Sequence, residues 1–219
     1  MLVLALDTAT ARITAGVVHL SDDGPVTLAA RDAEGARAHA ELLAPAVAEA
    51  LAEAGRTRAD LDAVVAGLGP GPFTGLRVGL VTAAAMGDAL GLPVHGVPTH
   101  DALAAGVPGR LLVVTDARRR EVYWSRYADG VRTHGPEVVA PAELAARVDR
   151  DLGPVDRVVG DAAEKVGAPA GMPGPRPGGL VAVAAAALRA GTVPGPLVPL
   201  YLRRPDAVPP GAPKAVTRA

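Results

Sequence analysis

The order of apolar segments in the first half of the chain restricts its fold more than any other feature of the sequence. The chain opens with three short apolar runs separated by polar turns, at residues 2–6, 13–20 and 26–30. Such runs are typical of strands, and their close succession predicts an antiparallel meander. Helical spacing follows over 39–54, and residues 62–68 form a nearly continuous apolar run, which is typical of a strand buried on both faces.

Helices and strands then alternate. A long helix is predicted from the GPGPFTG segment to about Leu90, followed by a strand over 92–97 and a short helix with Thr99 as its N-cap. Residues 1–108 therefore have the order β-β-β-α-β-α-β-α, an antiparallel start joined to right-handed parallel crossovers. This order resembles the ribonuclease-H-like half-domain of actin-like proteins.

A second round of elements begins near Arg110. A strand and its hairpin partner come first, then a third strand, a helix over 141–148, a further strand and a final helix over 179–191. The second half resembles a shortened copy of the first. We therefore expect an α/β, actin-like or ribonuclease-H-like duplicated fold in two lobes, with a first lobe over 1–108, a shortened second lobe over 109–204 and a mobile tail over 205–219.

Composition excludes several classes of protein. The chain is 49% hydrophobic and 21% charged, which excludes an intrinsically disordered protein. It contains no cysteine, which excludes a disulfide framework, a thiolate zinc site, an iron–sulfur cluster and a cysteine nucleophile. Asp, Arg or Gly interrupts the longest apolar stretches, and the N-terminus lacks the basic region of a signal peptide. We therefore expect a cytoplasmic protein without a membrane segment.

Charge is distributed unevenly along the chain. Residues 1–109 carry 6 basic and 12 acidic side chains, whereas residues 110–219 carry 16 basic and 11 acidic ones. This asymmetry indicates two halves with different partners, or two halves that face each other. Arg118, Arg119 and Arg120 lie at a predicted hairpin tip, which would either contact nucleic-acid phosphates or form a solvated turn. The chain has only five aromatic residues, and a base-stacking surface usually needs more.

Asp7, Thr8 and Thr10 follow the first strand in the segment DTAT. A turn at this position could present hydroxyl and amide groups to a phosphate, with Asp7 holding magnesium through water. These three residues are therefore candidates for nucleotide binding. In the alternative interpretation, Asp7 and Thr10 bond to their own backbone in a structural turn.

The segment GLGPGPFTGLR, residues 67–77, lies between a buried strand and a helix, where phosphates often bind. It lacks the Lys-Ser/Thr pair of a Walker loop, and Pro70 and Pro72 have no N–H to donate. We therefore interpret this Gly/Pro loop as a rigid strand-to-helix turn in which Pro72 starts the helix. Arg77 would then serve an ion pair or a partner contact.

Metal binding and serine catalysis lack their usual residue patterns. His95 and His100 are five residues apart, which is not the spacing that places two imidazoles on one helix face. The sequence contains neither a His-Glu-x-x-His motif nor a Gly-x-Ser-x-Gly elbow. We expect no bound metal and no cofactor.

The helices predicted over 39–54 and 73–90 contain more apolar and small residues than one buried stripe requires. This excess predicts a helix–helix interface with a partner. Packing against the chain's own sheet is the alternative, and both can hold on opposite faces. The candidate interface residues are Glu41, Leu42, Val47, Leu51, Phe73, Thr74, Leu76, Arg77, Leu80 and Ala84.

Several segments together resemble one known family. They are LALDTAT, HAELLAP, GLGPGPFTGLRVGL, LGLPVHGVPTHDALA, VVTDARRREVYW and PLYLR, and they extend from residue 2 to about Arg204. These segments are similar to those of the TsaB (YeaZ) family, and the Gly/Pro string is the most specific of them. Pro72 departs from the pattern, because the family usually has Ser there, and the change removes a hydroxyl and an N–H.

The resemblance implies a non-catalytic dimerisation and activating subunit of the bacterial machinery that makes N6-threonylcarbamoyladenosine in tRNA. There a TsaD-type paralogue, with an HxxxH metal motif that this chain lacks, transfers threonylcarbamoyl to the adenosine next to the anticodon of ANN-reading tRNAs. The implied partners are this paralogue in a heterodimer through the first lobe, a TsaE-type ATPase, and tRNA through the complex. A homodimer is implied when the paralogue is absent.

Three alternatives stay open. An actin-like ATPase or kinase is favoured by Asp7 and Thr10, and disfavoured by the two prolines of the loop and the short second lobe. A glycoprotease-like metallopeptidase is disfavoured by the missing metal ligands. Direct tRNA binding through the positive second half would show a steep loss of affinity with salt.

Overall fold

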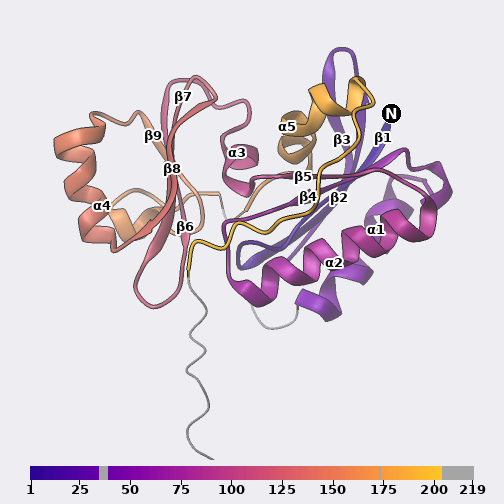
Figure 1. Cartoon of the computed structure of the whole chain (residues 1–219), viewed down its shortest axis with the longest axis horizontal. Helices are drawn as coiled ribbons and strands as arrows, with labels where there is room; N and C mark the ends of the chain where they lie inside the picture. Colours follow the sequence, from indigo (N-terminus) through magenta and orange to yellow (C-terminus); the bar gives the residue numbers. More distant parts are fainter. Residues whose placement is uncertain (35–38, 173, 204–219) are drawn as a thin grey trace, which may run out of the picture.

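The computed structural model describes residues 1–34, 39–172 and 174–203. Two sheets stand side by side, and each has its own helices (Figure 1). In these ranges, every helix is too short or too polar to cross a membrane. The segment 205–219, predicted to be a mobile tail, lies outside the described residues.

The first sheet has the strand order β3-β2-β1-β4-β5. Its antiparallel meander consists of β1 (Leu2–Asp7), β2 (Arg12–Ser21) and β3 (Gly24–Glu34). β4 (Ala63–Gly67) then pairs with β1 in parallel, and β5 (Val94–Val97) pairs with β4 in parallel. The order of these strands along the chain, with an antiparallel start followed by parallel pairing, is the one that the sequence predicts.

Helices α1 (His39–Glu53) and α2 (Phe73–Leu90) cover one face of the first sheet (Figure 1). The side chains that β1 directs to this face include Leu4 and Leu6, which are fully buried. α1 continues through Pro45. The observed bounds agree with the predicted ranges 39–54 and 73–90 to within one residue. The ranges were predictable because the apolar residues of each helix recur at the spacing of one helix face.

The opposite face of the first sheet is covered by α5 (Pro177–Arg189). Val3 of β1 and Leu180 of α5 belong to one buried apolar cluster there. The expected division into lobes placed this helix in 109–204, so its packing on the first sheet is a correction. Successive residues of a strand point to opposite faces, so the first sheet has a second apolar face that must be covered. α3 (Thr99–Ala104) is too short to cover this face alone, and α5 therefore packs there.

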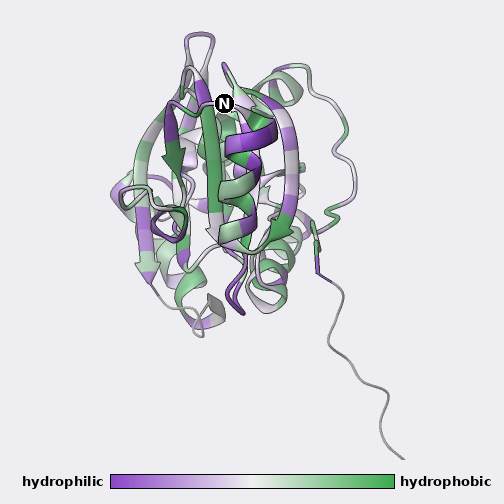
Figure 2. Cartoon of the chain, turned by 90° about the vertical axis from the view of Figure 1, so that its left-hand side faces the viewer, coloured by the Kyte–Doolittle hydropathy of each residue, from purple (hydrophilic) through white to green (hydrophobic). Residues whose placement is uncertain are grey.

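The second sheet has the strand order β8-β7-β6-β9. Its strands are β6 (Arg110–Asp116), β7 (Val122–Ala128), β8 (Val131–Val139) and β9 (Arg157–Val159), and α4 (Pro141–Arg147) packs on it through Leu144. Figure 2 looks onto this lobe, where polar (purple) and apolar (green) segments alternate along the strands. Single helical turns lie at Arg58–Asp60, Val148–Leu152 and Ala163–Val166. The two mixed sheets confirm the predicted α/β, actin-like and ribonuclease-H-like fold.

α3 lies between the two sheets (Figure 1). Its Leu103 packs in one buried cluster with Tyr127 of β7. The ring of His100 is fully buried, with Nδ1 2.7 Å from Ser125 Oγ and Nε2 2.9 Å from Thr115 Oγ1. These contacts join the first lobe to the second sheet.

Candidate functional site

Asp7, the last residue of β1, is completely buried beside the Gly/Pro loop. Its Oδ1 accepts a hydrogen bond from the N–H of Ala9 (2.7 Å), and its Oδ2 accepts one from the hydroxyl of Thr99 (2.6 Å). The Thr99 oxygen in turn accepts a hydrogen bond from the N–H of Gly69 (3.0 Å). Burial raises the pKa of Asp7 to about 6, although the two hydrogen bonds act in the opposite direction. The network ties β1, the loop and α3 together.

The role of Thr99 differs from the predicted N-cap of α3. Pro98 occupies the N-cap position, and Thr99 is the first helical residue. The Thr99 hydroxyl donates to Asp7 and makes no cap hydrogen bond to its own helix. The prediction is wrong because a capping pattern is local, whereas Asp7 lies 92 residues away along the chain.

Thr8 and Thr10 are also bonded within the chain. The Thr8 hydroxyl donates to the carbonyl of Gly75 (2.7 Å) and accepts from the N–H of Gly79 (3.0 Å). The Thr10 hydroxyl donates to the carbonyl of Arg12 (3.0 Å). The turn that contains these threonines is therefore held against the first part of α2.

The Gly/Pro loop approaches this turn so closely that two of its glycines have no room for a side chain. A Cβ atom at Gly67 would overlap the carboxylate of Asp7, and a Cβ atom at Gly71 would overlap the carbonyl of Ala9. Pro72 is the N-cap of α2, in agreement with its predicted place at the helix start. The loop is thus a strand-to-helix connection packed directly on the turn.

The candidate partner interface divides into buried and exposed residues. Four of the ten candidates point into the first lobe and are buried there, namely Val47, Leu51, Leu76 and Leu80. These four cannot contact a partner while the chain keeps this fold, which corrects the sequence-based selection. The exposed candidates are Glu41, Phe73, Thr74, Arg77 and Ala84, and Leu42 is half-buried.

The exposed side of α2 carries two large apolar side chains, Phe73 at 53% and Val81 at 64% exposure. The guanidinium carbon of Arg77 lies 5.1 Å from the centre of the Phe73 ring, which is a cation–π contact. The ring of Tyr201, from the C-terminal segment, lies 5.1 Å from the Phe73 ring between centroids. Tyr201 is not among the interface residues that the sequence predicts, and its one signal was its place in the PLYLR segment.

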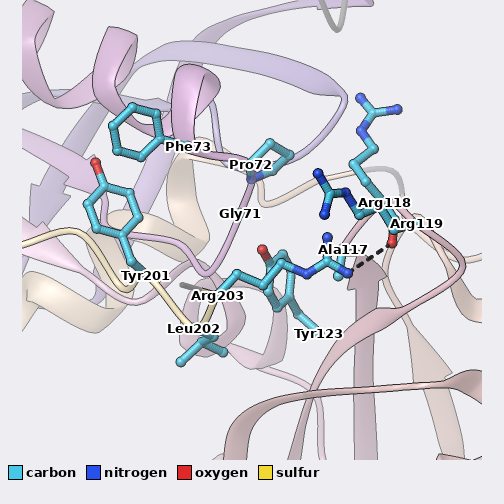
Figure 3. A pocket seen from close by; sticks show the side chains of 10 residues that line it. All are labelled: Gly71, Pro72, Phe73, Ala117, Arg118, Arg119, Tyr123, Tyr201, Leu202 and Arg203. Atoms are coloured by element: carbon cyan, nitrogen blue, oxygen red, sulfur yellow. Dashed lines mark hydrogen bonds between the residues drawn. The ribbon is translucent and has the colours of Figure 1, made fainter. Parts of the chain in front are cut away.

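A pocket of about 400 Å³ lies beside this aromatic pair (Figure 3). Phe73 and Tyr201 line one side of it, and Arg118 and Arg119 of the predicted hairpin tip line the other. Arg203 extends from the C-terminal segment toward the tip. The structure therefore brings the end of the Gly/Pro loop and the arginine tip, which are separate in the sequence, to one place.

The described ranges contain no group of three His, Cys, Asp or Glu side chains that could hold a metal ion. His95 lies on β5, and burial lowers the pKa of His100 to about 3, so that its ring is neutral at pH 7. Ser125, which lies against His100, is fully buried. This pair therefore belongs to the contact between the lobes and is not an accessible nucleophile with its base.

Comparison with known proteins finds relatives over most of the chain. The family model that matches residues 33–194 is described as TsaD: tRNA N6-adenosine threonylcarbamoyltransferase. An uncharacterized protein of Mycobacterium tuberculosis is 54% identical over 210 residues, which are 94% of each chain. The Escherichia coli protein named tRNA threonylcarbamoyladenosine biosynthesis protein TsaB is 36% identical over 148 residues, 64% of this chain and 62% of its own.

A solved structure, YeaZ from Pseudomonas aeruginosa, superposes on this chain with a TM-score of 0.70. It is 26% identical, and the match covers 92% of this chain and 99% of YeaZ. The family model, the E. coli relative and this superposition agree with the resemblance seen in the sequence segments. The chain belongs to the TsaB (YeaZ) family.

Proposed function

We propose that this chain is a non-catalytic subunit that activates a TsaD-type transferase in the synthesis of N6-threonylcarbamoyladenosine in tRNA. The observation that carries the proposal is the exposed face of α2, where Phe73 and Val81 are more than half exposed. Membership of the TsaB family supports the pathway, for which the E. coli relative is named.

The face of α2 suits a protein partner because of its residue types. Aromatic and arginine side chains, here Phe73 and Arg77, contribute strongly to binding in protein interfaces. The exposed Ala84 and Ala85 allow a second helix to approach closely. A stable complex buries about 800 Å² on each partner, an area that α2 and the neighbouring α1 together are long enough to supply.

The DTAT turn supports a non-catalytic role. A magnesium ion at this turn would need the Asp7 carboxylate, and a phosphate would use the Thr8 hydroxyl, but both groups are bonded inside the protein. Pro70 and Pro72 supply no N–H groups to the loop packed on the turn. An ATPase or kinase activity would require this network to open.

The proposal also names the partners. The TsaD-type paralogue binds the exposed residues of α1 and α2 and transfers threonylcarbamoyl to the adenosine next to the anticodon of ANN-reading tRNAs. A TsaE-type ATPase and tRNA join this cytoplasmic heterodimer. When the paralogue is absent, the same face pairs two copies of the chain.

Two matched valines test the proposal. Val81 on α2 is 64% exposed and Val131 on β8 is 69% exposed, so arginine at either position leaves the core unchanged. Val81→Arg should weaken binding of the paralogue at least tenfold in calorimetry, because it places a charge in the centre of the interface. Val131→Arg should bind like the wild type.

The same variants should differ in a reconstituted reaction. It contains the paralogue, the TsaE-type ATPase, the threonylcarbamoyl-adenylate synthase, tRNA, ATP, threonine and bicarbonate, and mass spectrometry measures the modified adenosine. Omission of this chain should abolish product, and Val81→Arg should lower it far more than Val131→Arg. Equal product without the chain, or product from the chain alone, would contradict the non-catalytic activating role.

A further inference from the structure

Another pocket lies between the two lobes, on the side of the first sheet that α5 covers. Its walls come from α3 and the residues that follow it, from the hairpin of β7 and β8, and from α5. Its volume is about 390 Å³, which is within the range of small-ligand sites. Helices α1 and α2 lie on the opposite face of the first sheet, so a partner bound to them does not use this surface.

The lining of this pocket carries one positive and one negative side chain. They are Arg132 of β8 and Asp101 of α3, and the remaining lining residues are uncharged. Nε of Arg132 lies 3.7 Å from Oδ1 of Asp101, which is an ion pair but too long for a hydrogen bond. Among the residues that the structure describes, none forms a hydrogen bond with the Arg132 guanidinium. Its N–H donors can therefore bind a ligand.

The Asp101 carboxylate is held in place from inside the protein. The hydroxyl of Tyr127 donates a hydrogen bond to Asp101 Oδ1 (2.6 Å). Burial raises the pKa of Tyr127 well above its usual range, so the hydroxyl keeps its proton and stays a donor. The other carboxylate oxygen, Oδ2, accepts no hydrogen bond from the described part of the chain. The carboxylate is thus oriented, and one of its oxygens can accept from a ligand.

We propose that this pocket binds a free α-amino acid in its zwitterionic form. The carboxylate of the ligand bonds to Arg132, and its ammonium group bonds to Asp101. An α-amino acid carries both groups on one carbon atom, which matches two opposite charges that lie side by side. A simple anion or cation would be attracted by one of these side chains and repelled by the other, whereas a zwitterion is attracted by both.

The uncharged part of the lining restricts the side chain of the ligand. Ala182 and Val183 of α5, together with Ala105 after α3, form a wall of small apolar residues. A charged ligand side chain would lose its hydration against this wall without gaining a partner. We therefore expect an amino acid with a small apolar side chain, such as alanine or valine.

This inference goes beyond the proposed function and does not depend on it. The pocket residues come from both lobes, since Asp101 and Val183 belong to helices on the first sheet and Arg132 belongs to the second sheet. A bound amino acid would therefore add contacts between the lobes and stabilise their arrangement.

Heteronuclear NMR of the ¹⁵N-labelled full chain tests the site. L-Valine should shift the amide signals of Gly106 and Gly130, which line the pocket, and leave the signal of Gly55, which follows α1, unchanged. The dissociation constant should be below about 1 mM. Two analogues each lack one charge: 3-methylbutanoate has no ammonium group and 2-methylpropylamine has no carboxylate. Each should bind about tenfold more weakly, because it loses a charge-assisted hydrogen bond.

Variants of the two charged residues assign the contacts. Arg132→Gln and Asp101→Asn should each weaken L-valine binding about tenfold. The amide oxygen of asparagine can still accept from Tyr127, so the buried hydroxyl keeps a partner. The control Arg147→Gln changes a side chain on α4, outside the pocket, that has the same exposed fraction as Arg132. It should bind L-valine like the wild type.

Three results would overturn the proposal. The first is that glycine, L-alanine and L-valine at about 10 mM all fail to shift the signals of Gly106 and Gly130. The second is equal binding of either analogue and L-valine, which would indicate a site for a simple anion or cation. The third is equal binding by Arg132→Gln and Arg147→Gln. These measurements use this chain alone, so they hold whether or not the chain activates a transferase.

Discussion

Replacing Asp7 with asparagine should change how folding stability depends on pH. Burial raises the pKa of this carboxyl from 3.8 to about 6, and a difference of about two units corresponds to about 3 kcal/mol. Because the native pKa is the higher one, the native state holds the proton more tightly between pH 4 and 6. The Asp7 carboxyl therefore lowers the free energy of unfolding as pH rises through this range. Asparagine does not titrate, and its amide can still accept from Ala9 and bond to Thr99.

Urea unfolding at several pH values between 4 and 7 measures this effect. The free energy of unfolding of the wild type minus that of Asp7→Asn should fall by about 2 kcal/mol over this range, because part of the total change lies below pH 4. Taking the difference cancels the other titrating groups. Asp23→Asn, in the exposed β2–β3 turn, should follow the wild type throughout. Parallel curves for the wild type and Asp7→Asn would refute the reasoning, because they would mean that water reaches the carboxylate.

Two further predictions concern the same junction. Gly67→Ala places a Cβ atom on the Asp7 carboxylate and should lower the free energy of unfolding by about 1–3 kcal/mol in urea titrations. In the control Gly195→Ala, the Cβ atom meets nothing within 4 Å, so the free energy of unfolding should stay within about 0.5 kcal/mol of the wild type. Equal losses for the two variants would contradict the close packing of Gly67 on Asp7. The pKa of His100 is lowered from 6.5 to about 3, so its native ring resists protonation and stability is lost as pH falls below 6.5. His100→Gln should avoid about 3 kcal/mol of this loss at pH 4, and a decline as steep as the wild type's would count against a buried neutral ring.

Local sequence patterns predicted the helices and strands of the fold. Tertiary contacts determine which residues of these elements are exposed and can contact a partner. The strands and helices were predictable because apolar spacing is a property of each segment alone. The sequence could not show that Val47 and Leu76 face inward, because the exposed stripe of each helix is also apolar or small. The partners of Asp7 and the stacking of Tyr201 on Phe73 join segments far apart in the chain, so no spacing rule contains them.

Asp7 and His100 act on stability with opposite signs over the same pH range. As pH falls from 6 to 4, the buried carboxyl gains its proton and stabilises the native state by about 2 kcal/mol, while the buried imidazole destabilises it by a similar amount. The two contributions nearly cancel in the wild type. Asp7→Asn alone should therefore make the decline at low pH steeper, His100→Gln alone should reverse it, and the double variant should return close to the wild-type slope. Thr99 bonds to one of the two groups and precedes the other in α3, so a deviation of the double variant from additivity measures the coupling through that helix.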